Sequence, residues 1–191
     1  MITGVVLAAG EGRRFGGTKQ VALVDGRPLA QHAIDALAEA GVDELLVVTG
    51  HEANSVERAL ALPAQGRFVR NPAYRDGQAT SLAAAFHEIA EHSEATVVLM
   101  ADQPGITADD VAVLIERFRA TRKQIVRLRF ADGPGPALLS REIYAEAGHL
   151  HGDVGARVLM ASHSEWIEEV EIGRNAPRDI DVPGDLEAGR D

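Results

Sequence analysis

A short apolar run that leads directly into a glycine-rich, basic segment constrains the fold of this chain more than any other feature. The run, Ile2 to Ala8, is rich in β-branched side chains, which predicts a buried strand. Glycine turns let backbone N–H groups approach an anion, and cationic side chains can neutralise its charge. The sequence therefore predicts a phosphate-binding loop at the carboxyl end of a first strand, where open α/β sheets place ligands. The residues of this loop that carry the prediction are Gly10, Gly12, Gly16, Gly17, Arg13, Arg14 and Lys19.

Neither of the two most common phosphate-binding loops matches this segment. The dinucleotide-binding pattern G-x-G-x-x-G is met by Gly10 and Gly12, but Phe15 stands at its third glycine. The P-loop pattern G-x-x-x-x-G-K-[ST] fits the spacing from Gly12 to Gly17, but Thr18-Lys19 reverses the last two positions. The segment is thus a phosphate loop of another kind or a surface turn with solvated charges.

The remainder of the chain alternates between helical and strand-like patterns. Helices are expected at residues 29–40, 53–62, 82–92 and 107–119, with a short one from Ser140 to about Ala147. Strands are expected at residues 45–49, 67–70, 96–100, 124–130 and 166–172. This order predicts an α/β fold: a three-layer sandwich around a mostly parallel, Rossmann-like sheet. A length of 191 residues fits one domain over residues 1–191.

A carboxylate follows the apolar run 96–100, in the segment Ala101-Asp102-Gln103-Pro104. The carboxyl end of a buried strand lies at the edge of the sheet where ligands bind. Mg²⁺ is typically held by one or two carboxylates together with substrate phosphates. Asp102 is therefore the first candidate for a metal ligand, and capping of the next turn is the alternative.

Two further segments carry weaker signals. The loop 71–81 precedes a helix that Thr80 or Ser81 would cap, which would present N–H groups at a positive helix end. A capped helix with no ligand is the alternative. Near the C-terminus, alternation places Asp179 and Asp181 on one face of an extended segment. Capping of a last helix by Asp181 and Asp185 is the alternative there.

Composition excludes several classes of function. The chain has no cysteine, which rules out a disulfide scaffold, a thiolate metal site and a cysteine nucleophile. A formal net charge of −10 argues against nucleic-acid binding, and it requires that any phosphate site be a local cluster of positive groups. The first apolar run is too short to span a bilayer. We therefore expect a cytoplasmic protein with neither nucleic acid nor a membrane as its partner.

Four separated motifs make the chain similar to a known family. They are Leu7-Ala8-Ala9-Gly10-x-Gly12-x-Arg14-Phe15-Gly16-x-x-Lys19, Gly77-x-x-x-Ser81-Leu82, Leu99-x-x-Asp102-Gln103-Pro104 and Asp179-Ile180-Asp181-x-Pro183-x-Asp185-Leu186. Together they resemble the motifs of the MobA-like nucleotidyltransferases, and most closely those of the molybdenum cofactor cytidylyltransferases. The resemblance covers the whole chain and implies the fold of the nucleotide-diphospho-sugar transferases.

The resemblance also implies roles for individual residues. It gives Arg14, Lys19 and Asp102 catalytic roles, and it makes Asp102 and Asp181 the ligands of Mg²⁺. It implies that Ala9 goes with CTP rather than GTP. The nucleotide-binding residues that it implies are Leu7, Ala8, Ala9, Gly10, Gly12, Arg14, Lys19, Gly77, Ser81 and Asp102.

The acceptor side departs from the family pattern. The resemblance implies that Gly135, Pro136, Asp153 and Arg157 lie near the acceptor, the last two within Gly152-Asp153-x-Gly155-Ala156-Arg157. In the cytidylyltransferases a histidine on the pterin side is expected where this chain has Gly135. The departure weakens a claim about the acceptor more than one about the nucleotide.

The resemblance implies transfer of CMP from CTP to the terminal phosphate of molybdopterin, with release of pyrophosphate. The expected partners are CTP, a molybdopterin-type phosphorylated acceptor, and a molybdoenzyme or its chaperone. Three alternatives stay open: another NTP or phosphorylated acceptor, an NAD(P)H-dependent reductase of the nicotine-blue type, and a noncatalytic chaperone for the cofactor. The reductase would need a nicotinamide site, and Phe15 in place of a third glycine argues against one.

Overall fold

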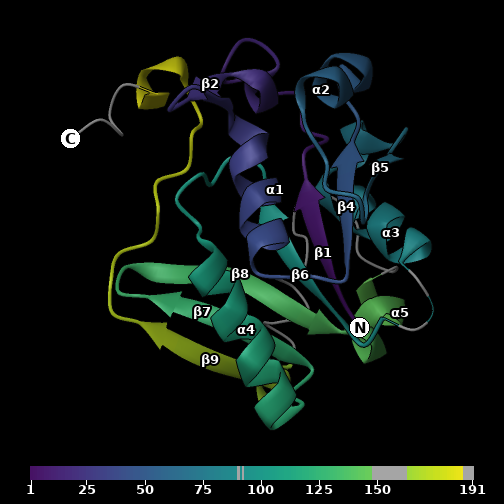
Figure 1. Ribbon diagram of the computed structural model, residues 1–191, viewed down its shortest axis with the longest axis vertical. Helices are drawn as coiled ribbons and strands as arrows, with labels where there is room; N and C mark the ends of the chain where they lie inside the picture. The colour runs from purple at the N-terminus through teal and green to yellow at the C-terminus, as the bar shows by residue number, and fades with distance from the viewer. Residues whose placement is uncertain (90, 92, 148–162, 187–191) are drawn as a thin grey trace.

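The chain folds around a seven-stranded sheet with the order β5-β4-β1-β6-β8-β7-β9 (Figure 1). The computed structural model describes residues 1–89, 91, 93–147 and 163–186. Neighbouring strands are parallel except where β8 pairs, antiparallel, with β6 and β7. The mostly parallel α/β sheet expected from the sequence is therefore confirmed. The strands are β1 (Ile2–Leu7), β4 (Glu44–Thr49), β5 (Gly66–Arg70), β6 (Ala95–Met100), β7 (Ile125–Phe130), β8 (Gly133–Ser140) and β9 (Ile167–Ile172).

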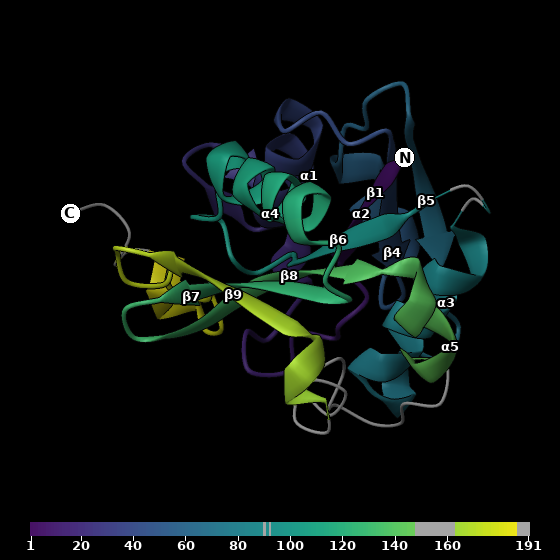
Figure 2. The same cartoon turned by 90° about the horizontal axis from the view of Figure 1, so that it is seen from below.

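Helices cover both faces of this sheet (Figure 2). On one face lie α1 (Leu29–Glu39), α2 (Ala53–Ala59) and α4 (Ala108–Thr121), and on the other α3 (Gln78–Glu88) and α5 (Tyr144–Ala147). Strand β1 is buried on both sides: Val6 packs into the core beneath α1 and α4, whereas Val5 packs with residues of α3. This double burial explains why β1 is a continuous apolar run in the sequence. None of the described helices is long and apolar enough to cross a bilayer.

Helix α3 begins four residues before the expected position, and the prediction that Thr80 or Ser81 caps it was wrong. The residue before the helix is Gly77, whose φ of 108° is open to glycine but disfavoured for other residues. The hydroxyl of Thr80 donates instead to the carbonyl oxygens of Gly77 (2.8 Å) and Ala73 (3.0 Å). Ser81 consequently lies within the helix and is buried.

Strand β8 and a small hairpin were not predicted from the sequence. Strand β8 contains Gly133-Pro134-Gly135-Pro136, a composition typical of turns, and it forms a strand because β6 and β7 pair with it on both sides. A small hairpin joins β2 (Leu23–Val24) to β3 (Arg27–Pro28) through Asp25 and Gly26, both with positive φ. The short 3₁₀ helices are η1 (Lys19–Val21), η2 (Tyr74–Asp76), η3 (Arg141–Ile143), η5 (Ser164–Trp166) and η6 (Pro183–Leu186).

The candidate site lies at one edge of this sheet. Strands β1 and β6 run side by side with Leu7 opposite Met100, so the loops that follow the two strands leave the sheet together. Figure 1 shows the arrowheads of β1 and β4 pointing toward the end of the molecule that carries η6. The parallel topology therefore brings the glycine-rich loop, the segment after β6 and the C-terminal segment to one edge.

Candidate active site

The loop after β1 owes its shape to Gly12. Its φ is +61°, and a Cβ atom there would lie 2.4 Å from the carbonyl oxygen of Gly17. The carbonyl oxygen of Gly12 accepts hydrogen bonds from the N–H groups of Phe15 (2.9 Å) and Gly16 (3.0 Å). The loop thus curls back on itself, and the Lys19 N–H donates to Gly17 at 2.9 Å. This curl delivers Lys19 to the end of β6.

Gln20 supports the start of the same loop, although nothing in the sequence pattern singled it out. Its side-chain Nε2 donates to the carbonyl oxygen of Gly10 at 2.7 Å, and the residue is 2% exposed. A buried amide that holds one loop carbonyl fixes the direction of the neighbouring peptide groups. Its place in the sequence, directly after Lys19, is the one signal that could have pointed to it.

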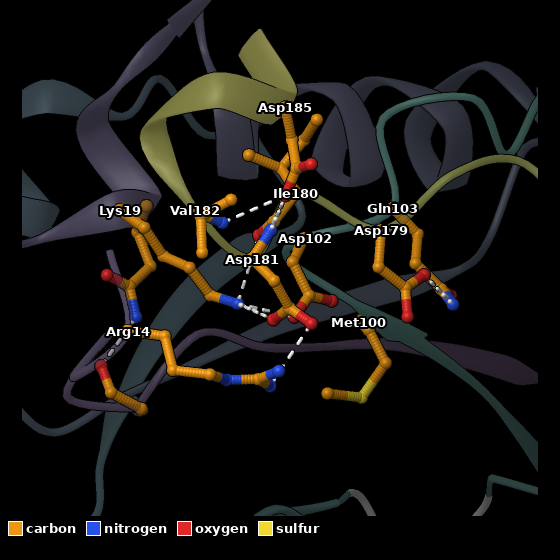
Figure 3. A network of polar contacts seen from close by, with 12 residues as sticks. Arg14, Lys19, Met100, Asp102, Gln103, Asp179, Ile180, Asp181, Val182 and Asp185 are labelled. Atoms are coloured by element: carbon orange, nitrogen blue, oxygen red, sulfur yellow. Dashed lines mark hydrogen bonds and ion pairs between the residues drawn. The ribbon is translucent and has the colours of Figure 1, made fainter. Parts of the chain in front are cut away.

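Four predicted site residues meet around the Lys19 ammonium group (Figure 3). Its Nζ lies 2.7 Å from Oδ2 of Asp102 and 3.4 Å from Oδ1 of Asp181. The other Asp181 oxygen, Oδ2, lies 3.1 Å from a guanidinium nitrogen of Arg14. These side chains come from the loop after β1, the end of β6 and the C-terminal segment. The structure thus brings together the residues that the resemblance assigned to phosphates and metal.

The C-terminal segment is fixed against the end of β6 by backbone and side-chain hydrogen bonds. The N–H of Ile180 donates to the carbonyl oxygen of Asp102 at 2.9 Å, and the Ile180 side chain is buried. Gln103 Nε2 donates to Oδ1 of Asp179 at 2.8 Å. Burial, with smaller contributions from the charges of Asp102 and Asp181, raises the pKa of Asp179 above its usual value. The segment is therefore fixed directly before Asp181.

Asp185 and Asp181 have different roles in this segment. Oδ2 of Asp185 accepts hydrogen bonds from the N–H groups of Asp181 (2.8 Å) and Val182 (2.9 Å), which lower the pKa of Asp185. Asp185 thus caps the turn into η6, as the alternative interpretation of the sequence held. The Asp181 side chain instead faces Lys19 and Arg14.

A hollow of about 430 Å³ opens beside this cluster, between the glycine-rich loop and the start of α3. Several predicted nucleotide-binding residues line it: Leu7, Ala9, Gly10, Gly12, Arg14, Lys19, Gly77, Ser81 and Asp102. Ala8 is the exception, because its side chain is buried in the core on the α1 face. Met100 and Gln78 also line the hollow, and neither was predicted.

The rim of the hollow carries two further arginines, held by one carboxylate. Oε2 of Glu11 accepts from Nε of Arg13 at 2.7 Å, and Oε1 of Glu11 lies 3.4 Å from Nε of Arg75. These contacts, led by the hydrogen bond from Arg13, lower the pKa of Glu11. Arg75 was missed from the sequence because its place at the rim depends on the fold of the loop 71–77. The local positive cluster required by the net charge of −10 is thus present.

Gly135 and Pro136, the two predicted acceptor-side residues that the structure describes, do not line this hollow. A Cβ atom on Gly135 would lie 2.4 Å from Cε2 of Phe130 and 3.0 Å from Cβ of Leu128, so position 135 faces packed core. Pro136 is buried in the same strand. The backbone of this chain therefore has no room for the histidine expected there. Asp153 and Arg157 lie outside the residues that the structure describes.

The carboxylate pair suits a divalent cation that shares its coordination with a ligand. Asp102 and Asp181 already present oxygens to one cationic group, the ammonium of Lys19. No cluster of three or more His, Cys, Asp or Glu side chains that could hold a metal occurs among the described residues. Two carboxylates completed by substrate phosphates is the arrangement typical of Mg²⁺. The donor set therefore fits a hard divalent cation bound together with a phosphorylated ligand.

Comparison with known proteins places this geometry in context. The sequence profile of the MobA-like NTP transferase domain matches residues 4–166. The nicotine blue oxidoreductase of Paenarthrobacter nicotinovorans is 31% identical over 192 aligned residues, which cover 95% of this chain and 92% of that protein. The bifunctional protein GlmU of Staphylococcus epidermidis is 30% identical over 126 residues, which are 65% of this chain. That match spans only 27% of the length of GlmU.

Solved structures of other proteins are also similar to this chain along nearly its whole length. The crystal structure of Rv0371c from Mycobacterium tuberculosis H37Rv superposes with a TM-score of 0.86 and 29% identity, covering 98% of this chain and 95% of that one. A second structure of that protein, in complex with manganese, superposes with a TM-score of 0.82 and 28% identity, covering 98% and 96%. A divalent cation therefore binds at least one protein similar to this chain.

Proposed function

This chain belongs to the MobA-like NTP transferase family, and we propose that it transfers CMP from CTP to the terminal phosphate of a molybdopterin-type acceptor. The observation that carries the proposal is the meeting of Arg14, Lys19, Asp102 and Asp181 at one edge of the sheet. Cationic groups for phosphates and carboxylates for a metal are what nucleotidyl transfer requires within one site.

Positioning and charge neutralisation supply the proposed catalysis. Arg14, Lys19 and the N–H groups of the glycine-rich loop would hold the β- and γ-phosphates. An oxygen of the acceptor phosphate attacks the α-phosphorus, the bond from that phosphorus to the bridging oxygen breaks, and pyrophosphate leaves. Mg²⁺ held by Asp102 and Asp181 would neutralise charge on the transferring phosphate. An acceptor phosphate is already ionised, so no general base is needed.

The proposed base, cytosine, and the proposed acceptor are supported by fewer residues than nucleotidyl transfer itself. Ala9 lines the hollow, at the position where the resemblance implies a preference for CTP over GTP. Gly135 faces the core, so any recognition of a pterin in this chain uses other residues than a histidine there. The same chemistry with another NTP or another phosphorylated acceptor is the first alternative.

A reductase of the nicotine-blue type is the second candidate function. The similarity to the nicotine blue oxidoreductase, 31% identity over 92% of that protein, favours it. Hydride transfer has no use for two carboxylates placed around a cation in the phosphate loop, whereas nucleotidyl transfer needs them. We therefore place nucleotidyl transfer first.

Thermal unfolding with each ligand in turn separates these candidates. The protein would be heated with Mg²⁺ and CTP, GTP, ATP or NADPH, each at about 100 times its dissociation constant, which stabilises by about 2.7 kcal/mol. For a chain of this length the expected rise in Tm is roughly 5–10 °C. We expect a Mg²⁺-dependent shift that is largest with CTP. A shift with NADPH and none with any nucleoside triphosphate would reverse the order of the two functions.

The substitution Asp102→Asn tests the metal role of this carboxylate. The assay measures release of pyrophosphate from CTP in the presence of an extract that supplies the acceptor. The rate should fall by at least about 100-fold relative to the wild type, because charge on the transferring phosphate is no longer neutralised. Asp109→Asn, at an exposed position in the first turn of α4, is the matched control and should keep near-normal turnover. Near-normal turnover in a folded Asp102→Asn protein would contradict the assignment.

A further inference from the structure

Nζ of Lys19 contacts both of the carboxylates that the proposed function assigns to a metal. We infer that Lys19 closes the divalent-cation position of the ligand-free protein, and that the position opens when a nucleotide phosphate draws the ammonium group away. The inference rests on the proposed nucleotidyl transfer, and it adds an order of binding. The nucleotide phosphates engage Lys19 first, and the carboxylates then hold the metal tightly.

The contacts of the Lys19 ammonium group carry the first step. A lysine has three N–H donors. Nζ of Lys19 has three acceptors within reach: Oδ2 of Asp102 at 2.7 Å, the carbonyl oxygen of Ile180 at 3.2 Å and Oδ1 of Asp181 at 3.4 Å. The side chain is only 15% exposed, so water replaces these contacts poorly. The ammonium group is thus fully engaged by the oxygens of the candidate metal position.

A metal ion and this ammonium group would compete for the same oxygens. Mg²⁺ binds carboxylate oxygens at about 2.1 Å, so an ion that bridges Asp102 and Asp181 would lie between the two carboxylates. That space is where Nζ of Lys19 lies. Two cations cannot share it, because charge repulsion is strong in a half-buried site. Lys19 must therefore leave before the ion binds both carboxylates.

The rest of the hollow follows the same arrangement. Arg14 is paired with Asp181, and both Arg13 and Arg75 are paired with Glu11. Among the residues that the structure describes, each cationic side chain that lines the hollow is therefore paired with a carboxylate of this protein. An incoming triphosphate would exchange partners with these carboxylates: phosphate oxygens take the cations, and Asp102 and Asp181 turn to the metal. By linkage, each ligand must then raise the affinity for the other.

Binding of Mn²⁺ to the full chain, followed by electron paramagnetic resonance, tests the inference without turnover. In the absence of nucleotide, Lys19→Met should tighten Mn²⁺ binding by at least about tenfold, because it removes the competing charge. Lys19→Arg keeps a cation in place and should bind Mn²⁺ no more tightly than the wild type. A CTP analogue with a methylene bridge between the α- and β-phosphates should raise the Mn²⁺ affinity of the wild type far more than it raises the Mn²⁺ affinity of Lys19→Met.

Arg75→Met is the matched control. It removes one positive charge from the same hollow, but its partner is Glu11 rather than Asp102 or Asp181. Its Mn²⁺ affinity should stay within about twofold of the wild type, because a screened surface charge acts weakly at a distance. An equal rise in Arg75→Met and Lys19→Met would overturn the inference, since it would show a general effect of charge.

The remaining outcomes separate the inference from the proposed function. If the wild type converts CTP but folded Lys19→Met binds Mn²⁺ no more tightly, the closing role of Lys19 is wrong and nucleotidyl transfer stands. If CTP neither stabilises the wild type nor reacts, the proposed function fails. Lys19→Gln, which keeps a polar side chain, replaces Lys19→Met should the latter unfold. Failure of every variant to bind Mn²⁺ would overturn the inference as well.

Discussion

At the scale of single residues, Gly135 shows how little space the sheet leaves on its α4 face. The Gly135→His substitution would place a Cβ atom 2.4 Å from Cε2 of Phe130. That ring is 1% exposed and is covered by the guanidinium group of Arg174, 4.9 Å from its centroid. Overpacking of a buried site costs about 1–3 kcal/mol, so the free energy of unfolding in urea should fall by that amount.

Gly133→His is the control for this prediction. It introduces the same side chain into the same strand, at a position where a Cβ atom would meet nothing within 4 Å. Its free energy of unfolding should change by no more than about 0.5 kcal/mol. Equal stability of the two variants would show that the Phe130 ring moves aside, and a histidine at 135 would then fit this chain after all.

The same scale shows what the sequence could and could not predict about the site. Lys19 and Asp102 are 83 positions apart, yet both were predicted because each follows a buried strand and parallel strands end at one edge. Gly135 was placed on the acceptor side by resemblance alone. Its actual environment depends on Phe130, which lies across an irregular pairing of β7 and β8. No local pattern encodes such a contact.

At the scale of elements, the turn into η6 holds Asp181 in place. Asp185→Ala removes the acceptor for the N–H groups of Asp181 and Val182. Asp181 is a metal ligand in the proposed mechanism, and loss of a residue that supports a metal ligand typically lowers activity by about 10- to 100-fold. We expect a loss in this range in kcat. Asp185→Asn keeps an acceptor oxygen and should restore most of the activity. Equal loss in both variants would show that the charge of Asp185 acts directly on substrate rather than through Asp181.

Elements differ in how far the sequence encodes them. Strands β1 and β6 were predicted because burial on both faces leaves a continuous apolar run. A helix was predicted from residue 107, and the structure shows that Thr107 caps it, in a capping box with Asp110. Strand β8 was missed because its glycines and prolines are typical of turns, and only pairing with β6 and β7 makes it a strand. Tertiary pairing overrode local propensity there.

At the scale of the whole molecule, ion pairs between distant segments predict loss of stability in acid. Glu94 contacts the amino group of Met1 at 2.8 Å and Arg122 at 2.7 Å, so it joins the start of β1 to the end of α4. These contacts lower the pKa of Glu94 from 4.5 to about 2. Hydrogen bonds from Arg70 and Arg127 likewise lower the pKa of Glu57 and Glu169.

The direction of the pH effect follows from which state binds protons more tightly. Because the folded state lowers these pKa values, the unfolded chain takes up protons first as the pH falls. The contribution of Glu94 is therefore complete above about pH 4.5 and is lost progressively toward about pH 2. Urea unfolding of the chain that begins at Met1, measured between pH 6 and pH 2.5, should show stability that falls with pH over this window.

Glu94→Gln should make this fall less steep, because the substitution removes one group that takes up a proton on unfolding. Glu116→Gln is the matched control, since Glu116 is exposed on α4 and forms no ion pair with any described residue. It should leave the slope of stability against pH unchanged. If Glu94→Gln and the wild type lose stability in parallel from pH 4.5 downward, the charge contacts of Glu94 do not contribute to the fold. Acid lability would then have to come from the other carboxylates with lowered pKa values, such as Glu57 and Glu169.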